Sequence, residues 1–364
     1  MSEVFDIISF LKKAVSLGGS DEHIRVGHAP YIRKDGKIWK VNASPITDFD
    51  IQEILSVIVP STLRESMPFN DIDFIFEIKG CSRFRVNYSS QLAHPALVIR
   101  NIPYRIPTVE DLGLPSAIKQ FTQLSNGIVL VTGPTGCGKS STLAALIDLI
   151  NNEDQKHIVT LEDPVEFVFV NKKSIVSQRQ IGVDTTDFAS GLKYVLRQDP
   201  DIILVGEIRD EETMIAALKA AETGHLVFAT LHTNDAVQTI NRVVNMFEQT
   251  SRDVIRKQIA STLKGTIAQK LIYSEKHNKR FPACEVMVTT PTIQDYIIKD
   301  NMEEVYNCLK EGSYNEMMTL NTSLVQLVNE GKITEEEAMT ATEDDVELTQ
   351  MLKGAFSGTK NYYE

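Results

Sequence analysis

The segment GPTGCGKS at residues 133–140 constrains this chain more than any other feature of its sequence. It matches the phosphate-binding pattern G-x-x-x-x-G-K-[ST], and it stands between an apolar run at 128–131 and a helix-forming run at 141–150. Glycines in such a loop allow backbone N–H groups to wrap phosphates, and the N-terminus of the following helix adds positive potential. The segment therefore predicts a nucleotide site on a strand–loop–helix unit.

The residues of this loop have expected tasks. The Lys139 ammonium would reach the β- and γ-phosphates of ATP, and the Ser140 hydroxyl would hold Mg²⁺. Cys137 is interpreted as a small loop residue, with a redox-sensitive thiol as the alternative, because loop N–H groups can lower a thiol pKa. The predicted nucleotide contacts of the loop are Gly133, Pro134, Thr135, Gly136, Cys137, Gly138, Lys139, Ser140 and Ser141.

Strand and helix patterns alternate around the loop. Four apolar runs are short enough for strands buried on both faces, at 128–131, 158–161, 202–205 and 226–229. Helix-forming stretches separate them, for example at 141–150 and 211–222. This order predicts an α/β domain with a mostly parallel sheet.

A different pattern precedes this domain. Apolar spacing over residues 4–15 predicts a helix that stops at Gly18-Gly19, and strand-like segments with a turn signal at Asp35-Gly36 follow it. Two prolines within 101–107 favour an extended linker. From about residue 250 the pattern is mainly helical, and the seven acids between residues 334 and 347 indicate a solvated surface or a frayed tail.

Charge and apolar content argue against several classes of protein. The 364 residues include 49 acids and 37 basic residues, a formal charge of -12, whereas nucleic-acid binding usually requires a positive excess. We find no run of 18 or more uncharged apolar residues for a membrane span and no export signal at the N-terminus. Four scattered cysteines without a C-x-x-C pair exclude a cysteine-paired zinc knuckle and favour the cytoplasm. Any role at a membrane is expected to come through a partner.

Two acidic residues follow buried strands and are the expected catalytic carboxylates. Glu207 ends the stretch DIILVGE, so we expect it near Mg²⁺ at the edge of the sheet. Glu162, in LEDPVE at 161–166, is the expected general base for the attacking water, while Asp163 and Glu166 would orient neighbours.

Two histidines, His225 and His232, bracket the strand at 226–231. Their separation of seven is odd, so on a regular strand they point to opposite faces, which argues against a metal pair. A γ-phosphate sensor at one end of the strand and a core histidine at the other fit this spacing better.

Taken together, these stretches resemble the secretion-type ATPases, and specifically the retraction ATPases of bacterial type IV pili, from near residue 3 to about residue 330. The likeness rests on GSDEH at 19–23, RFRVN at 83–87, the phosphate loop, LEDPVEF at 161–167, LRQDPDIILVGEIRD at 196–210 and AAETGHLVFATLHTND at 220–235.

The resemblance implies a role for each acid and histidine named above. Glu162 matches the catalytic base of an aspartate box, and Glu207 matches an atypical Walker B acid that would hold Mg²⁺. His225 and His232 match a histidine box, with His232 expected in catalysis and His225 at the nucleotide.

The resemblance also implies a fold and an assembly. A small N-terminal α+β (PAS-like) domain, 1–100, and a linker, 101–112, would precede a RecA-like P-loop ATPase core, 113–275, and a helical C-terminal region with an acidic tail, 276–364. The chain would form a homohexamer in which Arg85 and Arg100, with Arg83 as a further candidate, complete the nucleotide site of a neighbour.

The expected function is a Mg²⁺- and ATP-dependent motor that powers pilus retraction in twitching motility. It would act at the inner face of the cell membrane on the pilus platform protein, by nucleotide-driven motion between its two domains. The family's C-terminal motif has two arginines that the segment TIQDYIIK at 292–299 lacks, so the main motor and an accessory paralogue both stay open. The alternatives are a type II or type IV secretion ATPase, a pilus-assembly ATPase, a nucleic-acid translocase and a nucleotide-gated regulator.

Overall fold

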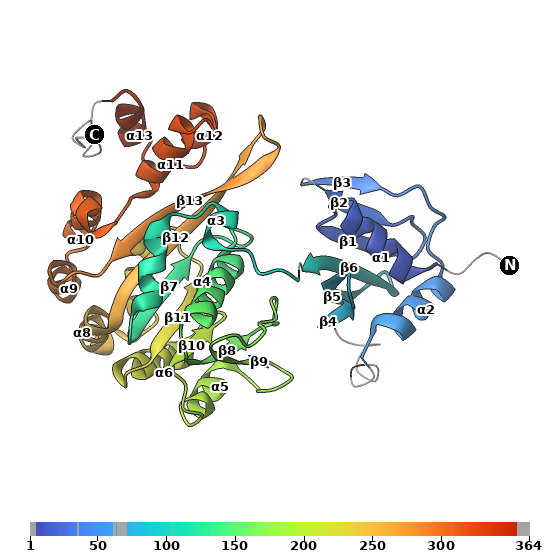
Figure 1. Ribbon diagram of the computed structural model, residues 1–364, viewed down its shortest axis with the longest axis horizontal. Coiled ribbons are helices and arrows are strands. Elements are labelled where there is room, and N and C mark those ends of the chain that lie inside the picture. Colours follow the sequence, from blue (N-terminus) through green and yellow to red (C-terminus); the bar gives the residue numbers. More distant parts are fainter. Residues whose placement is uncertain (1–4, 35, 61–62, 64–70, 103, 355–364) are drawn as a thin grey trace. The chain divides into compact units, whose positions relative to one another are not determined.

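The computed structural model describes residues 5–34, 36–60, 63, 71–102 and 104–354. Contacts divide the chain into two compact units (Figure 1): an N-terminal unit of Met1–Arg105 with Glu166–Val168, and a C-terminal unit of Ile106–Val165 with Phe169–Glu364. Asp35 of the predicted turn and Pro103 of the predicted linker lie outside the described residues. Within the described ranges, no helix has the length and apolar character needed to cross a bilayer.

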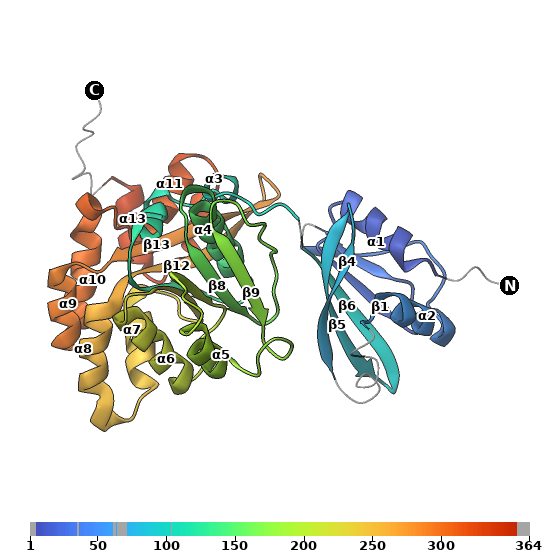
Figure 2. The same ribbon diagram turned by 60° about the horizontal axis from the view of Figure 1, so that its bottom comes forward.

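The N-terminal unit is an antiparallel sheet with two helices on one face (Figure 2). The sheet has the order β3-β2-β1-β6-β5-β4. The elements are α1 (Ile7–Ser16), β1 (Asp21–Arg25), β2 (Tyr31–Lys34), β3 (Lys37–Lys40), α2 (Asp48–Ile58), β4 (Ile72–Ile78), β5 (Ser82–Gln91) and β6 (His94–Ile102).

Local sequence explains the two helices. The α1 helix confirms the prediction from apolar spacing: Asp6 caps its N-terminus by accepting from the Ser9 N–H, and Gly18 follows its end with a φ of 78°. The α2 helix was not predicted, although Thr47 and Asp50 form a capping box directly before its buried isoleucines. Both helices bury their apolar sides against the sheet, which gives this unit its own core.

The C-terminal unit is built on a seven-stranded sheet with the order β13-β12-β7-β11-β10-β8-β9. Its strands are parallel except β13, as the α/β pattern predicted. The first elements are α3 (Val109–Leu112), η2 (Ser116–Gln123), β7 (Gly127–Thr132), α4 (Lys139–Glu153), β8 (His157–Glu162), β9 (Ile175–Gln180), α5 (Phe188–Val195), β10 (Ile202–Val205), α6 (Glu211–Glu222) and β11 (Leu226–Leu231).

Both faces of this sheet are covered. Every residue of β7, β10 and β11 is buried, since α4 and η2 cover one face and α5, α6, α7 (Ala236–Asn245) and α8 (Arg252–Thr262) pack on the other (Figure 2). The carboxyl ends of the parallel strands therefore meet at one edge, where the connecting loops can place functional side chains.

The prediction that the chain is mainly helical from about residue 250 is wrong for 263–288. Strands β12 (Leu263–Ser274) and β13 (Lys279–Val288) form a long antiparallel hairpin (Figure 1), and β12 pairs in parallel with β7. We expected the ATPase core to end at residue 275, which lies in the turn of this hairpin. The sheet therefore continues past that boundary through β13. The remaining elements are η3 (Gln249–Ser251), α9 (Pro291–Ile298), α10 (Met302–Glu311), η4 (Gly312–Asn315), α11 (Leu320–Asn329), α12 (Glu335–Met339) and α13 (Asp345–Leu352).

The acidic stretch at 334–347 is only partly the solvated surface or frayed tail that we expected. It includes α12 and the start of α13, which pack with α11 on the hairpin. The carboxylate of Glu347 is buried, accepts a hydrogen bond from Nδ2 of Asn321 at 2.7 Å, and pairs with Lys310. A buried carboxylate with two partners is a structural group and not a solvating one.

Candidate nucleotide-binding site

The predicted phosphate loop joins the carboxyl end of β7 to the N-terminus of α4. Gly133 and Gly138 have φ values of 139° and 96°, which favour glycine. Their surroundings also exclude a side chain, because a Cβ at Gly133 would lie 2.3 Å from the backbone oxygen of Gln269 in β12. The loop is thus shaped both by its own backbone and by the neighbouring strand.

The ammonium of Lys139 lies inside the loop. Its Nζ donates to the carbonyl oxygens of Gly133 at 2.8 Å and Pro134 at 3.1 Å, and lies 3.5 Å from Nδ1 of His232. Burial lowers the pKa of Lys139 from its ordinary value. A buried cation whose acceptors are neutral carbonyl groups gains from an anion, so this loop favours phosphate oxygens as a ligand.

Glu207 and His232 follow the adjacent strands β10 and β11 and meet beside the loop. Nε2 of His232 lies 3.0 Å from Oε1 of Glu207, while Nδ1 of the same ring faces Lys139. Arg209 holds both oxygens of Glu207, with Nε 2.7 Å from Oε1 and Nη2 donating to Oε2 at 2.8 Å. The bond from Arg209, with a smaller effect of His232, keeps the pKa of Glu207 below its usual range, so the carboxylate is ionised at neutral pH.

Glu162 ends β8, the strand next to β10. Its Oε1 accepts hydrogen bonds from the Thr160 hydroxyl at 2.7 Å and from Nε2 of Gln178 at 3.0 Å. The strands β7, β11, β10 and β8 are adjacent and parallel, so the structure brings Lys139, His232, Glu207 and Glu162 to the same edge of the sheet.

The other loop residues divide into exposed and buried ones. Pro134, Thr135, Gly136 and Ser140 are exposed, whereas Cys137 is buried. Burial raises the pKa of the Cys137 thiol, which is the opposite of what a redox-sensitive thiol needs. The structure therefore favours the interpretation of Cys137 as a small loop residue over the redox-sensitive thiol. Gly138 and Ser141 are partly buried at the start of α4.

Ser140 and Glu207 are the two groups that would hold Mg²⁺. In the described part of the chain, no group of three or more His, Cys, Asp or Glu side chains is arranged to hold a metal ion. Proteins usually bind Mg²⁺ through one or two side chains, while phosphates and water complete its shell. The exposed hydroxyl of Ser140 and the ionised carboxylate of Glu207 match this usual mode of Mg²⁺ binding.

His225 does not join this cluster. It precedes β11, at the amino ends of the parallel strands, whereas the phosphate loop follows their carboxyl ends. Its Nδ1 lies 3.0 Å from the carbonyl oxygen of Ala220 and 3.1 Å from the Thr223 hydroxyl. Within one chain, His225 therefore bonds only to its own surroundings at the amino ends of the strands. The expectation that it lies at the nucleotide of its own chain is wrong, because the phosphate loop follows the opposite ends of the strands.

The predicted arginines lie in the N-terminal unit. Arg85 in β5 and Arg100 in β6 are directly paired across the two strands, and both lie on the face of the sheet away from the core. Arg100 pairs with Asp21 at 2.8 Å, and Arg85 lies 3.6 Å from Asp73. Two guanidinium groups side by side form a positive patch whose repulsion these carboxylates reduce.

Sequence reasoning missed three residues of the site: Arg209, Gln178 and Gln269. Nε2 of Gln269 donates to the carbonyl of Cys137 at 2.6 Å, and its Oε1 accepts from the Thr142 hydroxyl at 2.7 Å. Arg209 stands two positions after Glu207, a spacing that could have suggested the pair. For the two glutamines the sequence carries no signal, because their contacts depend on strands that were not predicted.

Comparisons with known proteins identify the family of this chain. The family described as "Type II/IV secretion system protein" matches residues 62–360. The "Type IV pilus retractation ATPase PilT" of Pseudomonas aeruginosa is 42% identical, covering 92% of this chain and 97% of that relative. A "Twitching motility protein" of Neisseria gonorrhoeae is 37% identical, with coverages of 92% and 90%.

A solved structure is similar over the same length. "Crystal Structure of the Pilus Retraction Motor PilT and Bound ADP" has a TM-score of 0.88 and 39% identity, and covers 95% of this chain and 100% of that chain. The two-part α/β fold and the resemblance to the retraction ATPases are thereby confirmed. The chain belongs to the type II/IV secretion system protein family and, within it, is similar over nearly its whole length to the pilus retraction ATPases.

Proposed function

We propose that this chain is a Mg²⁺-dependent ATPase motor that powers the retraction of type IV pili. The observation that carries the proposal is the row of Lys139, His232, Glu207 and Glu162 along one sheet edge, beside a complete phosphate loop. Likeness to a pilus retraction motor over nearly the whole chain supports the pilus as the machine.

Each residue has a task in hydrolysis. Lys139 exchanges its bonds to loop carbonyls for phosphate oxygens, and the loop N–H groups bind the same anion. Mg²⁺, held by Ser140 and Glu207, would supply positive charge to the transferring phosphoryl group. His232 touches both Lys139 and Glu207, so it senses the phosphate through the groups that bind it. Glu162 orients the attacking water and accepts its proton.

Assembly and location belong to the same proposal. The chain forms a homohexamer, and Arg85 and Arg100 offer two planar cations to the nucleotide of a neighbouring subunit. Hydrolysis then moves the two units of each chain; the chain passes from one unit to the other at Arg105–Ile106 and again on either side of Glu166–Val168. The motor works in the cytoplasm, on the platform protein at the inner face of the membrane.

Deletion of the gene, with microscopy of surface pili and an assay of surface motility, tests the machine. Retraction predicts excess pili and lost motility. Loss of all pili would indicate an assembly ATPase, and unchanged pili with lost protein export would indicate a secretion ATPase. A complementing copy with Lys139→Ala is the control for turnover, because it restores the protein without its phosphate-binding charge and should leave the defect in place.

A further inference from the structure

We propose that Gln178 is a positioning residue of the reaction, which fixes the Glu162 carboxylate through its side-chain amide. This inference rests on the proposed role of Glu162 as the general base. Gln178 lies in the edge strand β9, where it is the direct partner of Thr160 in β8. Because side chains alternate along strands, Thr160, Glu162, Gln178 and Gln180 share one face of the sheet.

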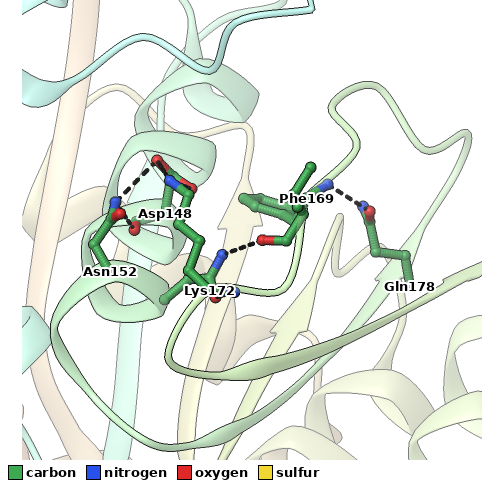
Figure 3. Close-up of polar contacts among 7 residues, drawn as sticks. Asp148, Asn152, Phe169, Lys172 and Gln178 are labelled. Atoms are coloured by element: carbon green, nitrogen blue, oxygen red, sulfur yellow. Dashed lines mark hydrogen bonds and ion pairs between the residues drawn. The ribbon is translucent and has the colours of Figure 1, made fainter.

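The orientation of the Gln178 amide follows from its other partner. The backbone N–H of Phe169 donates to Oε1 of Gln178 at 2.9 Å (Figure 3). A backbone N–H can only donate a hydrogen bond, so the Gln178 atom that faces Phe169 must be an acceptor, the amide oxygen. The NH₂ group must then face Glu162, to which Nε2 donates at 3.0 Å. The loop backbone thus decides which end of Gln178 meets the carboxylate.

Two donors meet the same oxygen of Glu162. The Thr160 hydroxyl donates to Oε1 at 2.7 Å, and Thr160 is fully buried, so its direction is fixed by the strand. Hydrogen bonds to a carboxylate stabilise its ionised form and hold its plane. A general base must be aimed at its water, and these two donors hold the Glu162 carboxylate in place.

The loop that holds Gln178 is itself fastened to α4. Nδ2 of the buried Asn151 donates to the carbonyl of Val170 at 2.8 Å, and Oδ1 of Asn151 accepts from the N–H of Lys172 at 3.1 Å. The Lys172 ammonium also pairs with Asp148 at 2.7 Å (Figure 3). Since α4 begins at the phosphate loop, the phosphate-binding and water-orienting groups are held by one continuous support.

The test is Gln178→Leu in the full chain, with Gln180→Leu as the matched control. Gln180 lies on the same face of β9 and accepts from the N–H of Val165 at 3.3 Å, so its loss also removes a bond to the loop backbone. For Gln178→Leu we expect kcat to fall on the order of tenfold and the KM for ATP to change by less than about twofold. The acid limb of the pH profile of kcat should move up by about one unit. Gln180→Leu should leave the limb in place.

Thr160→Val gives an independent arm that keeps nearly the same shape while removing the other donor. It should move the acid limb in the same direction, also without a large change in KM. If Glu162→Gln kept at least half of the turnover, the role of Glu162 as base would fail, and this inference with it. If Glu162→Gln were inactive while Gln178→Leu and Thr160→Val kept the wild-type kcat and pH profile, the positioning role alone would be overturned.

Discussion

Glu22→Gln should remove a pH-dependent weakness from the core of the N-terminal unit. Glu22 lies in β1, is fully buried, and neither of its oxygens has a hydrogen-bond partner among the described residues. Burial away from water, with a smaller effect of the Asp21 carboxylate, raises the pKa of Glu22 from 4.5 to about 8. In the folded state the carboxyl is therefore mostly protonated at neutral pH.

The sign and size of the effect follow from this shift. A raised folded-state pKa means that stability is highest below 4.5 and is lost as the pH rises toward 8, because the unfolded chain ionises first. One pKa unit corresponds to about 1.4 kcal/mol, so the cost is about 1 kcal/mol at pH 5 and about 3 kcal/mol at pH 7. The difference, about 2 kcal/mol, should be absent in the variant.

Urea unfolding at pH 5 and pH 7 measures this difference. Trp39 is the only tryptophan of the sequence and lies in β3 of the same unit, so its fluorescence reports on the unfolding of that unit. Glu53→Gln, at an exposed position of α2, is the matched control. The reasoning is refuted if the wild type and Glu22→Gln differ by the same free energy of unfolding at both pH values.

Three predictions concern the nucleotide site. Lys139→Ala should lower turnover by on the order of 10²–10³-fold in a phosphate-release assay. The melting temperature should stay unchanged, because the variant loses the two hydrogen bonds of the ammonium but also the cost of burying its charge. Substantial remaining turnover would contradict the role of Lys139 in binding phosphate. Arg209 pairs with both oxygens of Glu207 and would compete with Mg²⁺ for that carboxylate. In Arg209→Ala the half-saturating Mg²⁺ concentration for ATPase activity should therefore fall about two- to fivefold, and an increase would contradict this competition. Arg100→Ala chains should lose on the order of 10³-fold in turnover and regain activity when mixed with Lys139→Ala chains. If the mixture recovers no activity although both variants assemble, the nucleotide site is not shared between neighbouring subunits.

The sequence predicted the parts of the site that depend on strand direction. Apolar runs that are buried on both faces identify parallel strands, and the residues that follow them must lie at one edge. This is why Lys139, Glu162, Glu207 and His232 could be expected together from their positions alone. The same rule places His225 at the opposite edge of the sheet, because it precedes its strand. Strict use of the rule would have avoided the expectation that His225 lies at the nucleotide.

The parts that were missed depend on tertiary contacts. β12 is buried along most of both faces, so it lacks the alternation that would separate it from a helix. Its Gln269 and the Gln178 of β9 reach the site only because those strands pair with β7 and β8. In the same way, the pattern DEHIR at 21–25 does not reveal that the carboxyl of Glu22 is buried, with no hydrogen-bond partner among the residues that the structure describes.

Hydrolysis at this site and the movement of pili are linked most directly by video microscopy of labelled pili. The deletion strain would carry either the wild-type chain or Glu162→Gln, which preserves the shape of the side chain but removes the carboxylate that accepts the proton. We predict that pili extend in both strains and shorten only with the wild-type chain, while the purified variant still binds ATP. Pili that shorten at the wild-type rate with Glu162→Gln would contradict hydrolysis at this site as the source of retraction.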